Sequence, residues 1–121
     1  MSITVKDLKE HFKIPDDILD KEILEEFIVK ISTFLEAWRM VAPHLELSKQ
    51  DIESIDCDAK SEDEKRLLML QKWKQISIFN ATYRKLLEAL LSIKRADQAR
   101  KVCQMIMATQ GKSLCTYIIS S

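Results

Sequence analysis

Apolar residues recur along this chain at the spacing of one helix face. The clearest segment has apolar positions at i, i+3, i+4, i+7 and i+8, namely Tyr83, Leu86, Leu87, Leu90 and Leu91. An earlier segment, from about residue 20 to residue 32, places its apolar residues together in the same way: Ile23, Leu24, Phe27, Ile28 and Ile31. Strands would instead alternate every second residue. The pattern therefore predicts an all-α chain.

Residues that cap helix N-termini mark where the helices are expected to begin. In a capping box, a Ser or Thr hydroxyl accepts a backbone N–H and an acidic side chain three positions later bonds back. Four pairs have this spacing: Thr4 and Asp7, Thr33 and Glu36, Ser48 and Asp51, and Ser61 and Glu64.

Three further residues and one polar run are expected to bound helices. Asn80 is a plausible N-cap for the helix that contains Leu87, and Gly111 suits a left-handed C-cap after the last helix. Pro43 lacks a backbone donor, so it should kink or shorten the helix that starts at Thr33. The run from residue 57 to residue 64 breaks the apolar period and is expected to be a loop.

Large apolar residues on the inner helix faces are expected to anchor one core. These positions are Trp38, Ile52, Ile55, Leu70, Trp73, Leu87, Leu90 and Val102. Residues 67–70 are all apolar, and at about 100° per residue they cannot all face one core. Leu68 is therefore expected to face solvent and to offer an apolar contact to a partner.

The length and composition indicate one helical domain. The 121 residues include one Gly and two Pro, which leaves little material for hairpins. We expect a short N-terminal helix or arm over residues 1–17, a bundle over residues 18–110 and a flexible tail over residues 111–121. Residues 1–13 alternate charged and apolar groups, unlike a signal peptide, and the longest apolar runs are too short to span a membrane.

Charge is balanced overall but uneven along the chain. Residues 1–60 contain 14 acidic and 8 basic side chains, whereas residues 61–121 contain 5 acidic and 11 basic ones. Such a chain could associate head to tail as a dipole, although solvated helix faces would give the same counts. The acidic candidate interface is Glu46, Asp51, Glu53, Asp56 and Asp58. The basic candidate interface is Lys65, Lys72, Lys74, Arg84, Lys85, Arg95, Arg100 and Lys101.

Catalytic, cofactor and metal motifs are weak in this sequence. Gly-Lys-Ser at residues 111–113 lacks the second glycine of a P-loop, because residue 106 is Ile. His11 and His44 have no metal-ligand spacing to the cysteines. We expect no catalytic residue, metal, cofactor or small-molecule substrate, and hence no enzyme.

The number and spacing of the three cysteines indicate the cellular compartment of the chain rather than a catalytic or metal site. Cys57, Cys103 and Cys115 are odd in number and form no CxxC pair. A disulfide framework would need an even count, so a reduced, cytoplasmic chain is expected.

The basic C-terminal half leaves open a second function, nucleic-acid binding. The sequence Tyr83-Arg84-Lys85 and the Lys/Arg-rich last helices are its motivation. Overall neutrality and the absence of a recognition motif weigh against this alternative.

From residue 38 onward the order of features resembles the death-domain family. WRMVAPHLELSKQDIESI at residues 38–55 is similar to the second and third helices of that family. EKRLLMLQKWK at residues 64–74 is similar to the fourth helix, and NATYRKLLEALLSIKRADQARKVC at residues 80–103 to the fifth and sixth. The resemblance covers roughly residues 20–107. It departs at Lys94, where many relatives have glycine, and in the N-terminal arm, which has no counterpart.

This resemblance implies both a fold and a class of partner. The fold would be a six-helix antiparallel Greek-key bundle with the arm added. The function would be non-enzymatic binding to other death domains, by self-association or with an adaptor or receptor, in apoptotic or innate-immune signalling. In the family, a patch on helices one and four meets one on helices two and three, and the connection between helices four and five forms another. Neither nucleic acid nor membrane is an implied partner.

Overall fold

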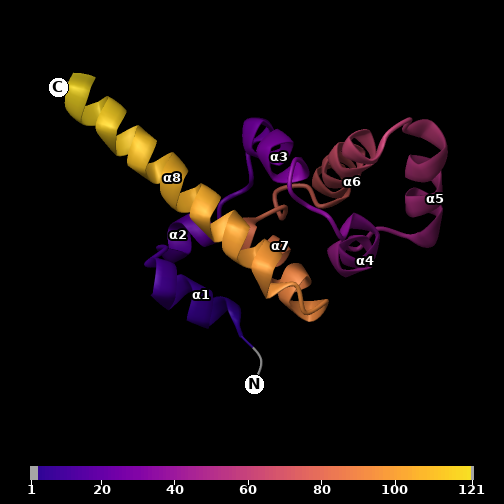
Figure 1. The fold of residues 1–121 in the computed structure, drawn as a ribbon, viewed down its shortest axis with the longest axis horizontal. Helices are drawn as coiled ribbons and strands as arrows, with labels where there is room; N and C mark the ends of the chain where they lie inside the picture. Colours follow the sequence, from indigo (N-terminus) through magenta and orange to yellow (C-terminus); the bar gives the residue numbers. More distant parts are fainter. Residues whose placement is uncertain (1–2, 121) are drawn as a thin grey trace.

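The computed structural model describes the backbone of residues 3–120 and the side chains of residues 3–109 (Figure 1). The helices are α1 Val5–Phe12, α2 Asp16–Leu19, α3 Glu25–Ser32, α4 Trp38–Val41, η1 Ala42–Leu45, α5 Lys49–Asp58, α6 Glu62–Ile76, α7 Tyr83–Ser92 and α8 Ala96–Ser120. The all-α prediction is confirmed. Within the described backbone, no helix has the length and apolar character needed to cross a bilayer.

Six helical units form the expected bundle: α3, α4 with η1, α5, α6, α7 and α8. Helix α6 packs on α3 and α5, and α7 packs on η1 and α8. Figure 1 shows α5 at one end of the molecule and α8 passing across α7, with its C-terminal end extending beyond the other helices. Helix α8 continues through residue 111, so the predicted C-cap at Gly111 is wrong. The predicted flexible tail concerns residues whose side chains lie outside the described ones.

The predicted core is largely confirmed. Seven anchors are buried: Trp38, Ile55, Leu70, Trp73, Leu87, Leu90 and Val102. Ile52 is only half-buried, because α5 lies at the edge of the bundle and buries Ile55 alone. Leu68 is half-buried against the core rather than solvent-facing.

The N-terminal arm is part of the core rather than an appendage. Thr4 and Asp7 form the predicted capping box, and α1 packs on α7 and α8. Val5, Leu8, Ile14 and Leu19 are buried in the same cluster as the bundle residues. The arm therefore covers a face of the bundle with apolar side chains of its own.

The predicted caps at Ser48 and Ser61 both form on extended backbone, but only one of them makes a complete capping box. Ser48 and Asp51 form both bonds of their box. Ser61 accepts the N–H of Glu64 at 3.2 Å, but the Glu64 carboxylate accepts the N–H of Lys60, so the second bond of that box is not made. Asp58 still belongs to α5, so the predicted loop from residue 57 to residue 64 shrinks to three residues, 59–61.

Two predicted N-caps are wrong. The Thr33 hydroxyl donates to the carbonyl of Lys30 at 2.6 Å and ends α3, so the next helix begins only at Trp38. The backbone then changes from α-helix to 3-10 helix at Ala42–Leu45, which includes Pro43, and this matches the expected shortening. Asn80 lies in a turn, and Thr82 caps α7 by accepting the N–H of Lys85 at 3.3 Å.

The connection between α7 and α8 is a tight turn through Lys94. Its φ angle is 61°, in the left-handed region that favours glycine. The departure from the family pattern noted at Lys94 therefore has a backbone cost at this position.

Candidate interaction surface

The predicted acidic and basic residues meet each other within one molecule. Asp56 is held by two hydrogen bonds from Arg39 and by Lys65 at 3.2 Å, and Asp51 lies 4.0 Å from Lys72. The hydrogen bonds from Arg39 hold the pKa of Asp56 below its ordinary value. Both aspartates, expected at an interface, thus already have partners on the same chain.

Three more of the predicted basic residues are bound to acids of the N-terminal half. Lys74 lies 3.9 Å from Glu25, and Arg95 lies 3.3 Å from Glu36. Arg84 contacts Asp16 at 2.9 Å and Asp20 at 2.6 Å. The opposite charges of the two sequence halves are therefore partly neutralised inside the molecule, which weakens the predicted head-to-tail dipole.

The remaining predicted residues have no ion pair within residues 3–109 and are exposed. They are Glu46, Glu53, Asp58, Lys85, Arg100 and Lys101. Asp58 does accept a hydrogen bond from the Ser54 hydroxyl at 3.3 Å. The other five form no side-chain hydrogen bond or ion pair among the described residues, so a partner could contact them without breaking one.

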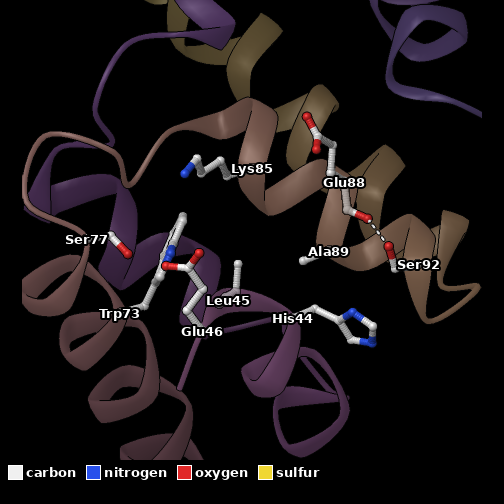
Figure 2. A pocket seen from close by; sticks show the side chains of 9 residues that line it. All are labelled: His44, Leu45, Glu46, Trp73, Ser77, Lys85, Glu88, Ala89 and Ser92. Atoms are coloured by element: carbon white, nitrogen blue, oxygen red, sulfur yellow. Dashed lines mark hydrogen bonds between the residues drawn. The ribbon is translucent and has the colours of Figure 1, made fainter. Parts of the chain in front are cut away.

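A polar cavity brings two of these free residues together (Figure 2). It has a volume of about 240 Å³ and lies between η1, the end of α6 and α7, with Glu46, Lys85 and Glu88 on its walls. Trp73 lines it but is 1% exposed, so its ring serves the core rather than a stacked ligand. The cavity therefore offers charged and polar contacts on its walls.

The two cysteines whose side chains are described differ in burial. The Cys103 side chain is buried on α8, and burial raises the pKa of its thiol to about 11. Cys57 is exposed on α5, and Cys115 lies outside the described side chains. Within the described residues, no group of three His, Cys, Asp or Glu residues gathers to hold a metal ion.

The most exposed apolar side chains lie at the connection between α6 and α7. This is the connection between helices four and five, where the family resemblance implies a contact patch, although none of its residues was predicted from the sequence. Ile78 is 66% exposed and Phe79 is 81% exposed, with Ile76 beside them at the end of α6. We call Ile76, Ile78 and Phe79 the hydrophobic knob. Its sequence signal is a pair of large apolar residues after the last core position, Trp73, and before the cap of the next helix.

The backbone holds the knob in an unfavourable conformation. Phe79 has a φ of 66°, which is uncommon for a residue with a bulky side chain. The turn is closed by the N–H of Asn80, which donates to the carbonyl of Ser77 at 2.6 Å. The connection is further fixed to the chain before α3, because the N–H of Ile23 donates to the carbonyl of Ala81 at 2.8 Å.

Comparisons with known proteins agree with the resemblance. A family model described as "Death domain" matches residues 21–106. THO complex subunit 1 from Mus musculus is 32% identical over 96 residues, which cover 78% of this chain and 14% of that protein. The chain thus spans a small part of the length of this relative. No solved structure matches the chain.

Proposed function

Because the chain belongs to the death-domain family, a family of protein–protein interaction domains, we propose that it is a non-enzymatic module that binds other death domains. The signalling setting that goes with this proposal is apoptotic or innate-immune. The cytoplasmic location stays a prediction that rests on the cysteine pattern.

The observation that carries this proposal is the hydrophobic knob. Single exposed apolar residues are normal on protein surfaces, but adjacent ones that include an almost fully exposed phenyl ring are typical of contact sites. A bulky residue at positive φ costs about 1–2 kcal/mol, and such strain is found most often at functional positions. Burying the knob against a partner would remove its apolar surface from water.

Charged residues around the bundle would set the orientation of a bound partner more than the affinity for it. Glu46 and Glu53 lie near the second and third helices of the bundle, and Lys85 lies on α7. Because these side chains are exposed and free of ion pairs within residues 3–109, a partner of opposite charge would be steered toward them. Lys65, Lys72 and Asp56 are poor choices for this role, since each already has a partner within the chain.

The test is binding to a panel of purified death domains, one of which is a second copy of this chain. We expect at least one to bind, and Phe79→Ser to weaken that complex by about tenfold or more, as for a central interface residue. The matched control is Met107→Ser, because Met107 is 37% exposed on α8, the sixth helix of the bundle, outside the patches that the resemblance implies. No binding by any panel member, or equal binding by Phe79→Ser, would contradict the proposal.

A second candidate function comes from the relative. THO complex subunit 1 is, by its name, a subunit of a complex. By analogy this domain would join a multi-subunit assembly whose partner is not a death domain. The THO complex subunits, tested singly against this chain, separate the two possibilities. Nucleic-acid binding has less support, because five of the eight predicted basic residues are paired with acids among the described side chains.

A further inference from the structure

A second hydrophobic feature, an apolar cleft, opens where the arm meets the bundle. Its volume is about 390 Å³, and its mostly apolar lining comes from α2, the start of α3, α7 and α8: Ile18, Leu24, Phe27, Tyr83, Ile106 and Thr109. Leu24, at the rim, is 56% exposed. Burial and, to a smaller extent, the charge of Glu26 raise the pKa of Tyr83 to about 12, so its phenol lines the cleft as a neutral group.

One wall of this cleft comes from α2, directly after the arm. Ile18 lies on α2, before the residues that the family model matches, whereas Lys21 is the first matched residue. Leu24 and Phe27 come from the start of α3, and Tyr83 from the first turn of α7. A bundle without α2 would lack the wall that Ile18 provides.

The cleft and the hydrophobic knob lie on either side of one ridge. A shallow hollow beside Ile78 and Phe79 is also lined by Glu22, and Glu22 lines the apolar cleft as well. The ridge consists of Lys21, Glu22 and Ile23. Its backbone is fixed, because Glu22 forms an isolated antiparallel β-bridge with Thr82 and the N–H of Ile23 donates to the carbonyl of Ala81. The knob and the cleft are therefore held at a set spacing, with Lys21 and Glu22 between them.

We propose that the apolar cleft receives Phe79 from a second copy of this chain, and that the two copies exchange this contact reciprocally about a two-fold axis along the ridge. This inference deepens the proposed function and rests on it, because it names a partner for the hydrophobic knob. A two-fold arrangement places the knob side of one copy against the cleft side of the other, so both contacts form together.

The charges of the ridge suit this arrangement. Lys21 is exposed, and neither Lys21 nor Glu22 forms an ion pair among the described residues. When two identical ridges lie antiparallel, Lys21 of each copy comes opposite Glu22 of the other. The same two residues side by side in a parallel arrangement would put like charges together, which disfavours that register.

The chemistry of the two surfaces also matches. The lining of the cleft is mostly apolar, as a phenyl ring requires, and its charged residues are Lys21 and Glu22. Knob and cleft are both open to solvent in the single chain, so each copy would remove two exposed apolar features from water. The interface is small, so we expect a weak dimer in equilibrium with monomer.

The experiment is sedimentation equilibrium over a concentration series with the full chain. The variants are Phe79→Ser on the knob, Leu24→Glu on the cleft rim and Val29→Glu as the matched control. Val29 is 45% exposed on the same helix, α3, and lines neither the cleft nor the hollow beside the knob. Circular dichroism and thermal melts establish that each variant is folded.

The expected result is a wild-type dimer that Phe79→Ser and Leu24→Glu each weaken by about tenfold or more, while Val29→Glu leaves it unchanged. Mixing the two weakened variants should partly restore the dimer, because the intact cleft of the first receives the intact knob of the second and re-forms one of the two contacts. Lys21→Glu should also weaken the dimer, and adding Glu22→Lys to it should restore association.

Two results would overturn the inference. One is a wild-type chain that stays monomeric up to about 1 mM, and the other is a dimer that Leu24→Glu leaves intact. Either leaves the proposed function standing if a death domain from the panel still binds through Phe79. If Phe79→Ser has no effect on any complex, the proposed function fails as well.

Discussion

The guanidinium of Arg84 on α7 contacts the carboxylate of Asp20 at the end of α2, with Nε 2.6 Å from Oδ1. The same side chain reaches Asp16 at 2.9 Å, and Asp16 is also bonded by Lys9 of α1 at 3.0 Å. Three segments far apart in sequence are thus joined by one charged cluster. Arg84, predicted as an interface residue, instead holds the arm on the bundle.

Replacing Arg84 by Met should loosen the arm without unfolding the bundle. The ion pairs are largely exposed, so the expected loss of unfolding free energy is only about 0.2–1 kcal/mol. Hydrogen exchange should accelerate in α1 and α2 and stay the same in α6. Arg100→Met, on α8, is the control, because Arg100 is exposed and has no ion pair in the described part of the chain. Equal exchange in both variants would show that Arg84 does not fix the arm.

Trp73 should be among the most costly residues to truncate. Its side chain is 1% exposed between α6 and the neighbouring helices, so Trp73→Ala leaves a large cavity and should cost about 3–5 kcal/mol. Urea unfolding measures this loss. Phe79→Ala removes a comparably large ring from an exposed position and should stay within about 0.5 kcal/mol of wild type. Similar losses in the two variants would contradict the assignment of Trp73 to the core.

Lys94→Gly should be neutral or stabilising, unlike most Gly substitutions. Relief of the left-handed backbone is worth about 1–2 kcal/mol, and the greater freedom of Gly in the unfolded chain offsets about 0.5–1 kcal/mol of it. The same change at Lys101, inside α8, should destabilise by about 1 kcal/mol. Thermal unfolding should therefore rank Lys94→Gly above Lys101→Gly, and the reverse order would show that the turn is unstrained.

Acid should destabilise the fold through its paired aspartates. Hydrogen bonds from Arg39 to Asp56 and from Arg95 to Asp97 hold the pKa of each carboxyl below its ordinary value of 3.8. Below that value the unfolded chain takes up protons that the folded chain excludes, so stability falls as pH falls. Unfolding free energy should be level from about pH 7 to pH 5 and should decline below about pH 4.

The contribution of a single pair can be isolated in the same titration. Asp97→Asn removes one low-pKa carboxyl, so the acid decline should become shallower. Asp17→Asn is the matched control, because Asp17 is exposed and has no ion pair among the described residues. An unchanged slope for Asp97→Asn would show that Arg95 does not hold Asp97 in solution.

The helices and core were predictable because their signals are local. The period of apolar residues places Trp73 and Leu87 inside whatever the tertiary arrangement, and the Ser48 box needs only its own four residues. Thr33 has the same spacing, but a capping hydroxyl requires extended backbone and Thr33 has φ −69° and ψ −23°. The same Ser/Thr-to-acid spacing therefore caps a new helix at Ser48 but not at Thr33, because Thr33 directly follows a helix that is already formed.

The surface was less predictable because it depends on which segments the fold brings together. Lys65 and Asp56 look like free charges in the sequence, yet their side chains lie 3.2 Å apart. Phe79 is of a residue type that is usually buried, and it is exposed here because it lies in the turn closed by the hydrogen bond from Asn80 to Ser77. The apolar cleft is lined by residues of α2, α3, α7 and α8. It could not be predicted from a local sequence pattern, because these helices come together only in the tertiary fold.

The ion pairs between the two halves of the chain also bear on how the domain could be divided. Residues 59–61 join α5 to α6, and a cut there would release one strongly acidic and one strongly basic peptide. Long-range attraction would speed the encounter of such peptides, and added salt would slow it. The contacts from Lys74 to Glu25 and from Arg84 to Asp20 would then guide their alignment. The domain is thereby suited to reconstitution from two fragments, with ionic strength as the control on its rate.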